Sequence, residues 1–219
     1  MLYVNRRTIM TTKEQLRKDL HRAIHSGQHC QRAFDLDQVI PQEDIDLIIE
    51  AATQCPSKQN SDFYSVMAIT DRDTIEKIYK TTQTENGARF NPQTLANLLL
   101  IFNRNEPEDP RSAEQIQIAF DVEEALDEAW NDVETDRNQA VGIAAGFVNV
   151  TASMLGYKTG CNKCFYTDQV REVFGDNEMQ PILMMGIGFP DKSIKRNVDP
   201  RDGQEIDTFP KAPIKVTYV

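Results

Sequence analysis

The sequence is short of basic residues, cysteines and long apolar runs, and each shortage excludes a class of protein. Its 219 residues carry 24 Lys and Arg against 34 Asp and Glu, a formal net charge of −10, whereas a general nucleic-acid binder needs a basic face. No run approaches the roughly 18 apolar residues of a membrane span. Four cysteines are too few for a disulfide scaffold. We therefore expect no nucleic-acid partner and no membrane partner.

The N-terminus contains basic side chains but no apolar segment of the kind that a secretory signal requires. We therefore expect a cytoplasmic protein whose thiols stay reduced, with flexible residues 1–11. The chain also lacks the short signatures of several enzyme classes: it contains no G-x-S-x-G, no G-x-x-x-x-G-K-[ST], no H-E-x-x-H and no G-x-G-x-x-G.

Helical and strand patterns alternate along the chain. The sequence predicts helices over residues 12–26, 41–54, 71–80, 113–130, 138–155 and 167–174, mainly from apolar residues at helical spacing. Apolar runs predict strands over residues 63–70, 95–102 and 181–187, and the chain ends in the strand-like sequence IKVTYV. No internal repeat or domain boundary is evident, so we expect one domain over residues 1–219, of the α/β or α+β class.

Two patterns of metal-binding or redox residue types leave alternatives open. Cys161 and Cys164 form a C-x-x-C motif, which is either a redox dithiol or two thiols on a tight loop. The second interpretation is favoured, because the motif does not stand between a strand and a following helix. His21, His25 and His29 recur every four residues, but no Asp, Glu or Cys nearby completes a ligand set, so no metal site is expected.

A basic stretch stands out near the C-terminus of this acidic chain, with Lys192, Lys195, Arg196 and Arg201. Such a stretch is either a solvated tail or an anion site, in which Lys and Arg donate charge-assisted hydrogen bonds to a phosphate.

Several segments, taken in chain order, carry a family resemblance. They are residues 28–34 (QHCQRAF), 55–61 (CPSKQNS), 89–91 (RFN), 142–156 (GIAAGFVNVTASMLG) and 181–190 (PILMMGIGFP), followed by the basic pair Lys195-Arg196. The ordered set resembles the FMN-dependent nitroreductase family over residues 13–200. The resemblance implies an α+β fold of three α/β/α layers around a mainly antiparallel sheet, in an intertwined homodimer whose tail, residues 190–219, embraces the partner subunit.

The same resemblance implies which residues hold FMN at the dimer interface, although it singles out no catalytic residue. By position, the cofactor-binding residues are Gln28, His29, Cys30 and Arg32 of one subunit, Pro56, Ser57 and Asn60 of the other, and Asn91, Lys163, Cys164, Lys195 and Arg196. Arg32 would face the flavin N1–O2 edge, where a cation stabilises the reduced anion. Asn91 would reach the ring edge, the backbone around Lys163 and Cys164 would offer an N–H to flavin N5, and the Lys195-Arg196 pair would hold the phosphate.

The implied activity is transfer of hydride from NAD(P)H to flavin and then of electrons to a nitroaromatic, a quinone or a similar small electrophile. The alternative is a non-catalytic or differently reacting FMN-binding dimer of the same fold, such as a dehalogenase-like or flavin-processing protein. Departures from the family pattern keep it open: Gln28 replaces an Arg, Cys30 a Ser, residues 62–64 (DFY) a Gln-Pro-Trp, and Thr94 a basic residue. We also hypothesise that one thiol of the C-x-x-C motif touches the flavin ring, and that residues 103–135 could form a lid.

Overall fold

The structure is a computed structural model that describes residues 12–83, 90–106 and 133–218. Its helices are α1 (Lys13–Ser26), α2 (Gln42–Thr53), α3 (Arg72–Lys80), α5 (Val133–Met154) and α6 (Thr167–Phe174), with short 3-10 helices η1 (Lys58–Asn60) and η2 (Pro92–Thr94). Its strands are β1 (Tyr64–Ile69), β2 (Leu98–Arg104), β3 (Lys158–Asn162) and β4 (Pro181–Gly188). The segments expected to be flexible (1–11) and helical (113–130) lie outside the described residues, as does most of 103–135.

Local chemistry sets the ends of several helices close to where the sequence predicts them. The Thr12 side chain accepts a hydrogen bond from the Gln15 N–H at the start of α1, and Asp71 accepts one from the Thr74 N–H at the start of α3. Each cap satisfies a backbone donor that has no partner inside its helix. α6 ends at Gly175, whose φ of 65° is the left-handed conformation that glycine adopts without strain.

The four strands form one sheet in the order β1-β2-β4-β3. Every pair is antiparallel, which confirms the predicted sheet type. The apolar runs predicted as strands occupy the centre: β2 pairs with β1 on one side and with β4 on the other. Both central strands read as continuous apolar sequence because helices cover both faces of the sheet.

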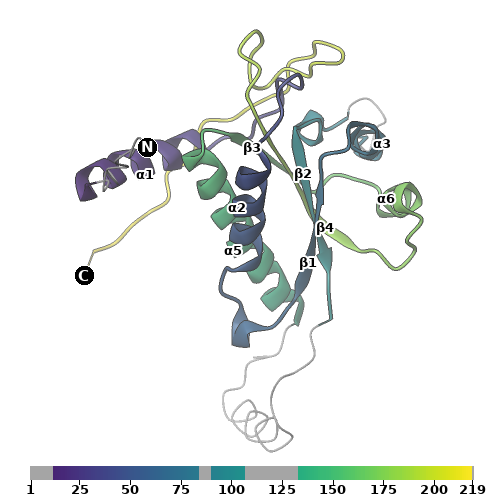
Figure 1. Ribbon diagram of the computed structural model, residues 1–219, viewed down its shortest axis with the longest axis horizontal. Helices are drawn as coiled ribbons and strands as arrows, with labels where there is room; N and C mark the ends of the chain where they lie inside the picture. Colours follow the sequence, from purple (N-terminus) through teal and green to yellow (C-terminus); the bar gives the residue numbers. More distant parts are fainter. Residues whose placement is uncertain (1–11, 84–89, 107–132, 219) are drawn as a thin grey trace, which may run out of the picture.

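Two apolar cores lie on opposite faces of this sheet, so the molecule has the three layers that the resemblance implies (Figure 1). α2 and α5 cover one face, where Leu98, Leu100 and Phe102 of β2 are buried. α3 and α6 cover the other, where Leu99 and Ile101 are buried. Alternate residues of one strand therefore reach opposite cores, as strand geometry requires. α1 contacts α5 and projects away from the sheet.

The structure corrects the sequence analysis at four places. α5 begins at Val133 and not at residue 138, because its first turn is polar and lacks the apolar spacing on which the prediction depends. β3 is absent from the predicted strands, because its residues KTGCN are mostly polar; pairing with β4 makes it a strand, so Cys161 lies within a strand and not on a tight loop. β2 begins at Leu98 and not at residue 95, because Leu95 still closes η2. The strand-like tail is not a strand: residues 214–218 are exposed, and none of the strands in the described part of the chain pairs with them.

None of the helices in the described ranges combines the length and the apolar character that crossing a bilayer requires.

Candidate functional site

Residues 28–34, here called the crossing segment, run beside β3 and beside the chain that follows β4. The Gln31 N–H donates to the carbonyl oxygen of Thr159 in β3 (2.8 Å), and the Arg32 N–H donates to the carbonyl oxygen of Arg196 (2.9 Å). These backbone hydrogen bonds join three parts of the chain that are far apart in sequence. The predicted residues of the crossing segment therefore lie next to the predicted basic pair.

Three basic residues belong to the segments that meet here. Arg196 Nη1 donates to the carbonyl oxygen of Cys30 (3.3 Å). Lys195 is exposed and forms an ion pair with the equally exposed Glu205 (3.2 Å), a kind of pair that contributes little energy in water. Arg32 is half-buried, and its guanidinium forms no hydrogen bond or ion pair with any described residue. An unpaired Arg32 thus stands on the segment whose backbone is bonded to Arg196, and this corner can attract an anion.

The C-x-x-C motif forms a braced turn at the end of β3. The Cys164 N–H donates to Asn162 Oδ1 (2.8 Å), and the Cys164 carbonyl oxygen accepts from Asn91 Nδ2 (3.2 Å). The structure therefore brings Asn91 to the predicted Lys163–Cys164 backbone. Because the Cys164 N–H is already used, the Lys163 N–H is the better candidate to donate to a ligand. Lys163 itself is exposed.

Gln93 is a site residue that the sequence analysis does not identify. Its Nε2 donates to the Cys161 carbonyl oxygen (3.3 Å), whereas its Oε1 is buried and has no partner among the described residues. A Cβ at Gly160 would lie 2.6 Å from Gln93 Cβ and 2.3 Å from the Gln31 carbonyl oxygen. The absence of a side chain at Gly160 therefore allows the segments that contain Gln31 and Gln93 to approach β3 closely. The only signal in the sequence is that Gln93 follows Asn91 by two positions.

A hollow of about 240 Å³ opens beside these residues. We call it the β3 hollow, and its lining comprises Gly27, Gln28, Cys30, Ala145, Gly146, Asn149, Thr159 and Cys161. One wall is fixed by Asn149, which accepts from Thr159 Oγ1 (2.5 Å) and donates through Nδ2 to the Gly27 carbonyl oxygen (3.0 Å). His29 is half-buried and does not line the hollow. Two predicted residues, Gln28 and Cys30, do.

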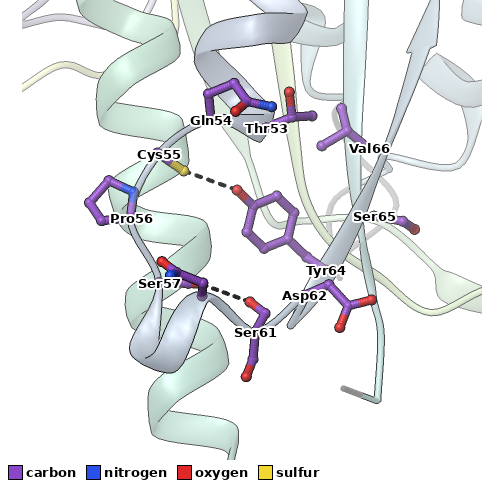
Figure 2. A pocket seen from close by; sticks show the side chains of 11 residues that line it. Thr53, Gln54, Cys55, Pro56, Ser57, Ser61, Asp62, Tyr64, Ser65 and Val66 are labelled. Carbon is purple, nitrogen blue, oxygen red and sulfur yellow. Dashed lines mark hydrogen bonds between the residues drawn. The ribbon is translucent and has the colours of Figure 1, made fainter. Parts of the chain in front are cut away.

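A second, larger hollow of about 630 Å³ follows the C-terminal end of α2 (Figure 2). We call it the η1 hollow, and residues 53–57, 60–62 and 64–66 line it. It contains the predicted residues Pro56, Ser57 and Asn60. The Ser57 hydroxyl donates to the Ser61 carbonyl oxygen (2.7 Å) and so holds the turn closed.

The backbone of η1 is strained. Gln59 and Asn60 both have positive φ, 55° and 57°, a conformation that costs most residues about 1 kcal/mol or more. Tyr64 closes the inner side of the hollow: its hydroxyl donates to the Ala52 carbonyl oxygen (2.6 Å) and lies 3.1 Å from Cys55 Sγ (Figure 2). Burial, together with Cys55, raises the pKa of Tyr64, so its hydroxyl stays protonated and remains a donor.

The two hollows share no lining residue. In Figure 1 the η1 turn lies at the end of the molecule opposite the loops of residues 190–206. One chain therefore brings together the crossing segment, Asn91, the C-x-x-C turn and the basic pair, but it keeps Pro56, Ser57 and Asn60 apart from them. Within the described residues, no three His, Cys, Asp or Glu side chains are grouped as metal ligands.

Comparison with known proteins places the chain in a family. The model of the nitroreductase family matches residues 26–189. The chain belongs to the nitroreductase family. Its fold agrees with solved members: a nitroreductase-like protein of Streptococcus mutans is 20% identical, with 85% of this chain and 94% of that chain covered and a TM-score of 0.62.

Two further structures match this nitroreductase-family chain. A protein of Staphylococcus epidermidis assigned as an NAD(P)H:FMN oxidoreductase is 20% identical over 87% of this chain and 92% of its own, with a TM-score of 0.57. A protein of Exiguobacterium sibiricum assigned as a nitroreductase, solved in complex with FMN, is 16% identical over 82% of this chain and 91% of its own, with a TM-score of 0.56. No match to a curated protein is found.

Proposed function

We propose that this nitroreductase-family protein is an FMN-dependent oxidoreductase of the cytoplasm. FMN, when bound, supplies two-electron redox chemistry between NAD(P)H as hydride donor and a nitroaromatic, quinone or similar electrophilic acceptor. Family membership supports the proposal, as do relatives of the same fold assigned as an NAD(P)H:FMN oxidoreductase and solved with FMN.

The observation that carries the proposal is the group of cations beside the crossing segment. Arg32 has no partner among the described residues, and Arg196 is placed beside it by a backbone hydrogen bond. FMN carries a phosphate, and its ring gains negative charge on reduction, so an FMN site needs cations of this kind. In this proposal Arg32 faces the ring edge, and the Lys195-Arg196 pair holds the phosphate with help from Gln28, His29 and Cys30.

The braced turn suits the ring of the cofactor. Asn91 keeps its side-chain oxygen available, because its Nδ2 is used by the Thr82 and Cys164 carbonyl oxygens. The Lys163 N–H donates toward flavin N5 in this proposal, and Cys164 positions that amide through its own hydrogen bond to Asn162. The buried, unpartnered Gln93 Oε1 offers a further acceptor next to Asn91.

We further propose a homodimer in which the η1 hollow of one subunit completes the site of the other. Pro56, Ser57 and Asn60 then reach the flavin held by the partner's crossing segment, which accounts for the separation of the two hollows within one chain. Large apolar side chains that one chain leaves exposed support a second copy: they include Leu16, Leu20 and Ile24 of α1, Phe147 of α5, and Phe209, Ile214 and Tyr218 of the tail. The tail of residues 190–219 embraces the partner in this arrangement.

A second candidate, a non-catalytic or differently reacting FMN-binding dimer, is favoured by one observation. Thr94 occupies the position where the family often has a basic residue, and it is fully buried, with its hydroxyl donating to the Asn91 carbonyl oxygen (2.9 Å). With Gln28 also uncharged, the site has fewer cations than the family pattern, which lowers the expected reduction potential of a bound flavin.

The visible absorption spectrum of the purified protein tests these proposals. We expect a yellow protein, or a colourless one that takes up added FMN, whose absorption near 450 nm bleaches when NADPH or NADH is added without oxygen. Reoxidation by a quinone or a nitroaromatic establishes turnover. Bound flavin that neither donor reduces would favour the second candidate. A protein that takes up no FMN would refute both.

A further inference from the structure

Two cysteines from distant parts of the chain meet in the β3 hollow. Cys30 belongs to the crossing segment and Cys161 to β3, and both line the hollow. Cys164, the sequence partner of Cys161 in the C-x-x-C motif, does not line it. The structure thus pairs Cys161 with a residue that the motif does not indicate. All four cysteines are free thiols.

The backbone around both thiols is held in place. The Cys161 carbonyl oxygen accepts from Gln93 Nε2 (3.3 Å), and the Cys30 carbonyl oxygen accepts from Arg196 Nη1 (3.3 Å). Between them, the hydrogen bond from Gln31 to Thr159 keeps the crossing segment against β3. Two thiols that share a hollow of about 240 Å³ on tethered backbones have a high effective concentration for each other.

Cys30 also acts electrostatically on Cys161. Burial first, and then the neighbouring Cys30, together raise the pKa of Cys161 to about 11. Cys161 therefore stays protonated at neutral pH, although its surface is open to the hollow. Because only a thiolate attacks a disulfide, Cys161 is a poor first nucleophile and serves better as the second thiol of the pair.

We propose that Cys30 and Cys161 form a redox-responsive pair, whose disulfide closes the β3 hollow and prevents FMN from binding. The second half of this statement rests on the proposed function, because it requires that Cys30 and the crossing segment contact the cofactor. The oxidant is a small-molecule disulfide. A pair of this type is regulatory, since structural disulfides are rare in reducing compartments.

The reaction balances as two thiol–disulfide exchanges. The Cys30 thiolate attacks one sulfur of the small disulfide, so that a mixed disulfide forms and one small thiolate leaves. Cys161 then loses its proton to solvent and attacks the Cys30 sulfur, which releases the second small thiolate. Two electrons pass from the protein to the small disulfide, and the two protons end on the released thiols. An excess of small thiol reverses both steps.

The β3 hollow would be closed because the Cys30–Cys161 disulfide would lie inside it. The disulfide would fill the space between the two sulfur atoms, and it would lock the crossing segment onto β3. The crossing segment could then no longer adjust to a cofactor. A bound FMN, conversely, would cover Cys30 and protect it. Oxidation and cofactor binding are therefore expected to exclude each other.

Peptide mapping of oxidised, flavin-free protein tests the pair without relying on activity. The full-length protein is stripped of flavin, treated with oxidised glutathione, and mapped by mass spectrometry under non-reducing conditions. We expect one bridge, Cys30–Cys161, a fall from four titratable thiols to two, and recovery with dithiothreitol. Cys30→Ser and Cys161→Ser should abolish the bridge, whereas the matched variants Cys55→Ser and Cys164→Ser should retain it. A Cys161–Cys164 bridge, or four thiols remaining, overturns the pair.

FMN binding tests the exclusion separately. We expect the oxidised protein to bind FMN at least tenfold more weakly than the reduced protein, and FMN-loaded protein to keep its four thiols under the same treatment. Equal affinity in the two states overturns the exclusion. If the reduced protein binds no FMN at all, the proposed function fails and the exclusion fails with it, whereas a mapped Cys30–Cys161 bridge still establishes the pair.

Discussion

The β3 hollow and the η1 hollow are built in opposite ways. The β3 hollow joins segments that are far apart in sequence, and backbone hydrogen bonds hold it together. The η1 hollow is lined by residues 53–66 of one continuous stretch and contains two residues with positive φ. No cation lines the first, but the segments that adjoin it contain Arg32 and Arg196, and Arg196 donates to the Cys30 carbonyl oxygen. In the second, the nearby Lys58 is paired with Asp136 (2.7 Å), and Asp62 adds negative charge.

This contrast indicates that the two hollows are suited to different parts of a ligand. A rigid corner with an unpaired cation can hold the charged parts of a ligand, whereas a strained turn can present backbone groups to a ligand's uncharged surface. Neither hollow provides both within one chain. The comparison therefore predicts that loss of a charge near β3 changes the affinity for an anion, whereas loss of tight packing or of a buried hydrogen bond at either hollow changes stability.

The largest effect on stability is expected from Gly160→Ala, which disrupts the packing of the crossing segment against β3. The added Cβ would lie 2.3 Å from the Gln31 carbonyl oxygen, so the crossing segment must move away from β3. We expect a loss of about 3 kcal/mol in the free energy of unfolding, measured by urea denaturation. Gly142→Ala is the matched control, because no atom beyond its chain neighbours and the backbone of its own helix lies within 4 Å of its added Cβ; in a helix it should stabilise by roughly 0.5–1 kcal/mol. Equal effects of the two changes would refute the tight crossing.

The second-largest effect, a loss of stability on the η1 side, is expected from Arg137→Met. Arg137 is 1% exposed; its Nε donates to the Phe63 carbonyl oxygen (3.3 Å) and its Nη1 to Glu134 (2.6 Å). Removing these donors should cost about 2 kcal/mol. Arg104→Met is the control, because its pairs with Glu106 and Glu134 are exposed and worth roughly 1 kcal/mol or less. If Arg104→Met proved as costly, burial would not be the reason that Arg137 matters.

Arg32→Ala sharpens the difference in charge between the hollows. The variant removes the unpaired cation of the crossing segment but no hydrogen bond within the described residues. We expect little change in stability and about tenfold weaker binding of FMN, which corresponds to about 1.4 kcal/mol, by fluorescence titration. Arg17→Ala, on the exposed face of α1, should leave the affinity unchanged. Unaltered affinity in Arg32→Ala would remove Arg32 from the site.

The smallest effect concerns pH and the loop that follows the basic pair. Asp199 is 3% exposed, and burial raises its pKa, although a hydrogen bond from the Arg201 N–H opposes this. Because the pKa of Asp199 is higher in the folded state than in the unfolded state, ionising its carboxyl group lowers the stability of the fold. The stability that the protonated group contributes is fully present below the ordinary pKa of about 3.9 and is lost as pH rises through the raised pKa. Asp199→Asn should therefore gain stability relative to the wild type between pH 3 and pH 7.

Asp71→Asn is the matched control for that titration. Hydrogen bonds from Thr74 lower the pKa of Asp71 in the folded state. The stability that the ionised carboxylate contributes is therefore present above the ordinary pKa of an aspartate and is lost as pH falls through the lowered pKa. The Asn variant should lose stability relative to the wild type at pH 7, and the difference should shrink in acid. Urea denaturation at several pH values measures both trends. Parallel trends in the two variants would contradict the assignment of Asp199 as a buried acid.

Much of the fold could be predicted from the sequence because it depends on repeating apolar patterns. The helices that begin at Lys13, Arg72 and Thr167 and the central strand β4 agree with their patterns closely. β3 could not be predicted, since a five-residue polar strand becomes a strand only through its neighbour β4. Leu95 reads as part of an apolar strand, but the 3-10 turn before it delays the strand.

The candidate site divides in the same way. The family resemblance gives the order of its segments, and the structure brings Cys30, Asn91, Cys164 and Arg196 together. The role of Gln93 and the meeting of Cys30 with Cys161 could not be predicted. They result from backbone contacts between distant segments, and the sequence of side chains does not indicate such contacts.

The hydrogen bond between Arg196 and Cys30 joins residues that are 166 positions apart, and this separation has a consequence for biosynthesis. A ribosome adds about 5–20 residues per second, so the crossing segment waits roughly 8–33 s before its C-terminal neighbour exists. Until then, the Arg32 N–H lacks its native acceptor, the Arg196 carbonyl oxygen. Under the proposed function, flavin is therefore captured only after release or very late in translation, and we expect truncated chains that end before residue 196 to lack the hydrogen bond between Arg196 and Cys30.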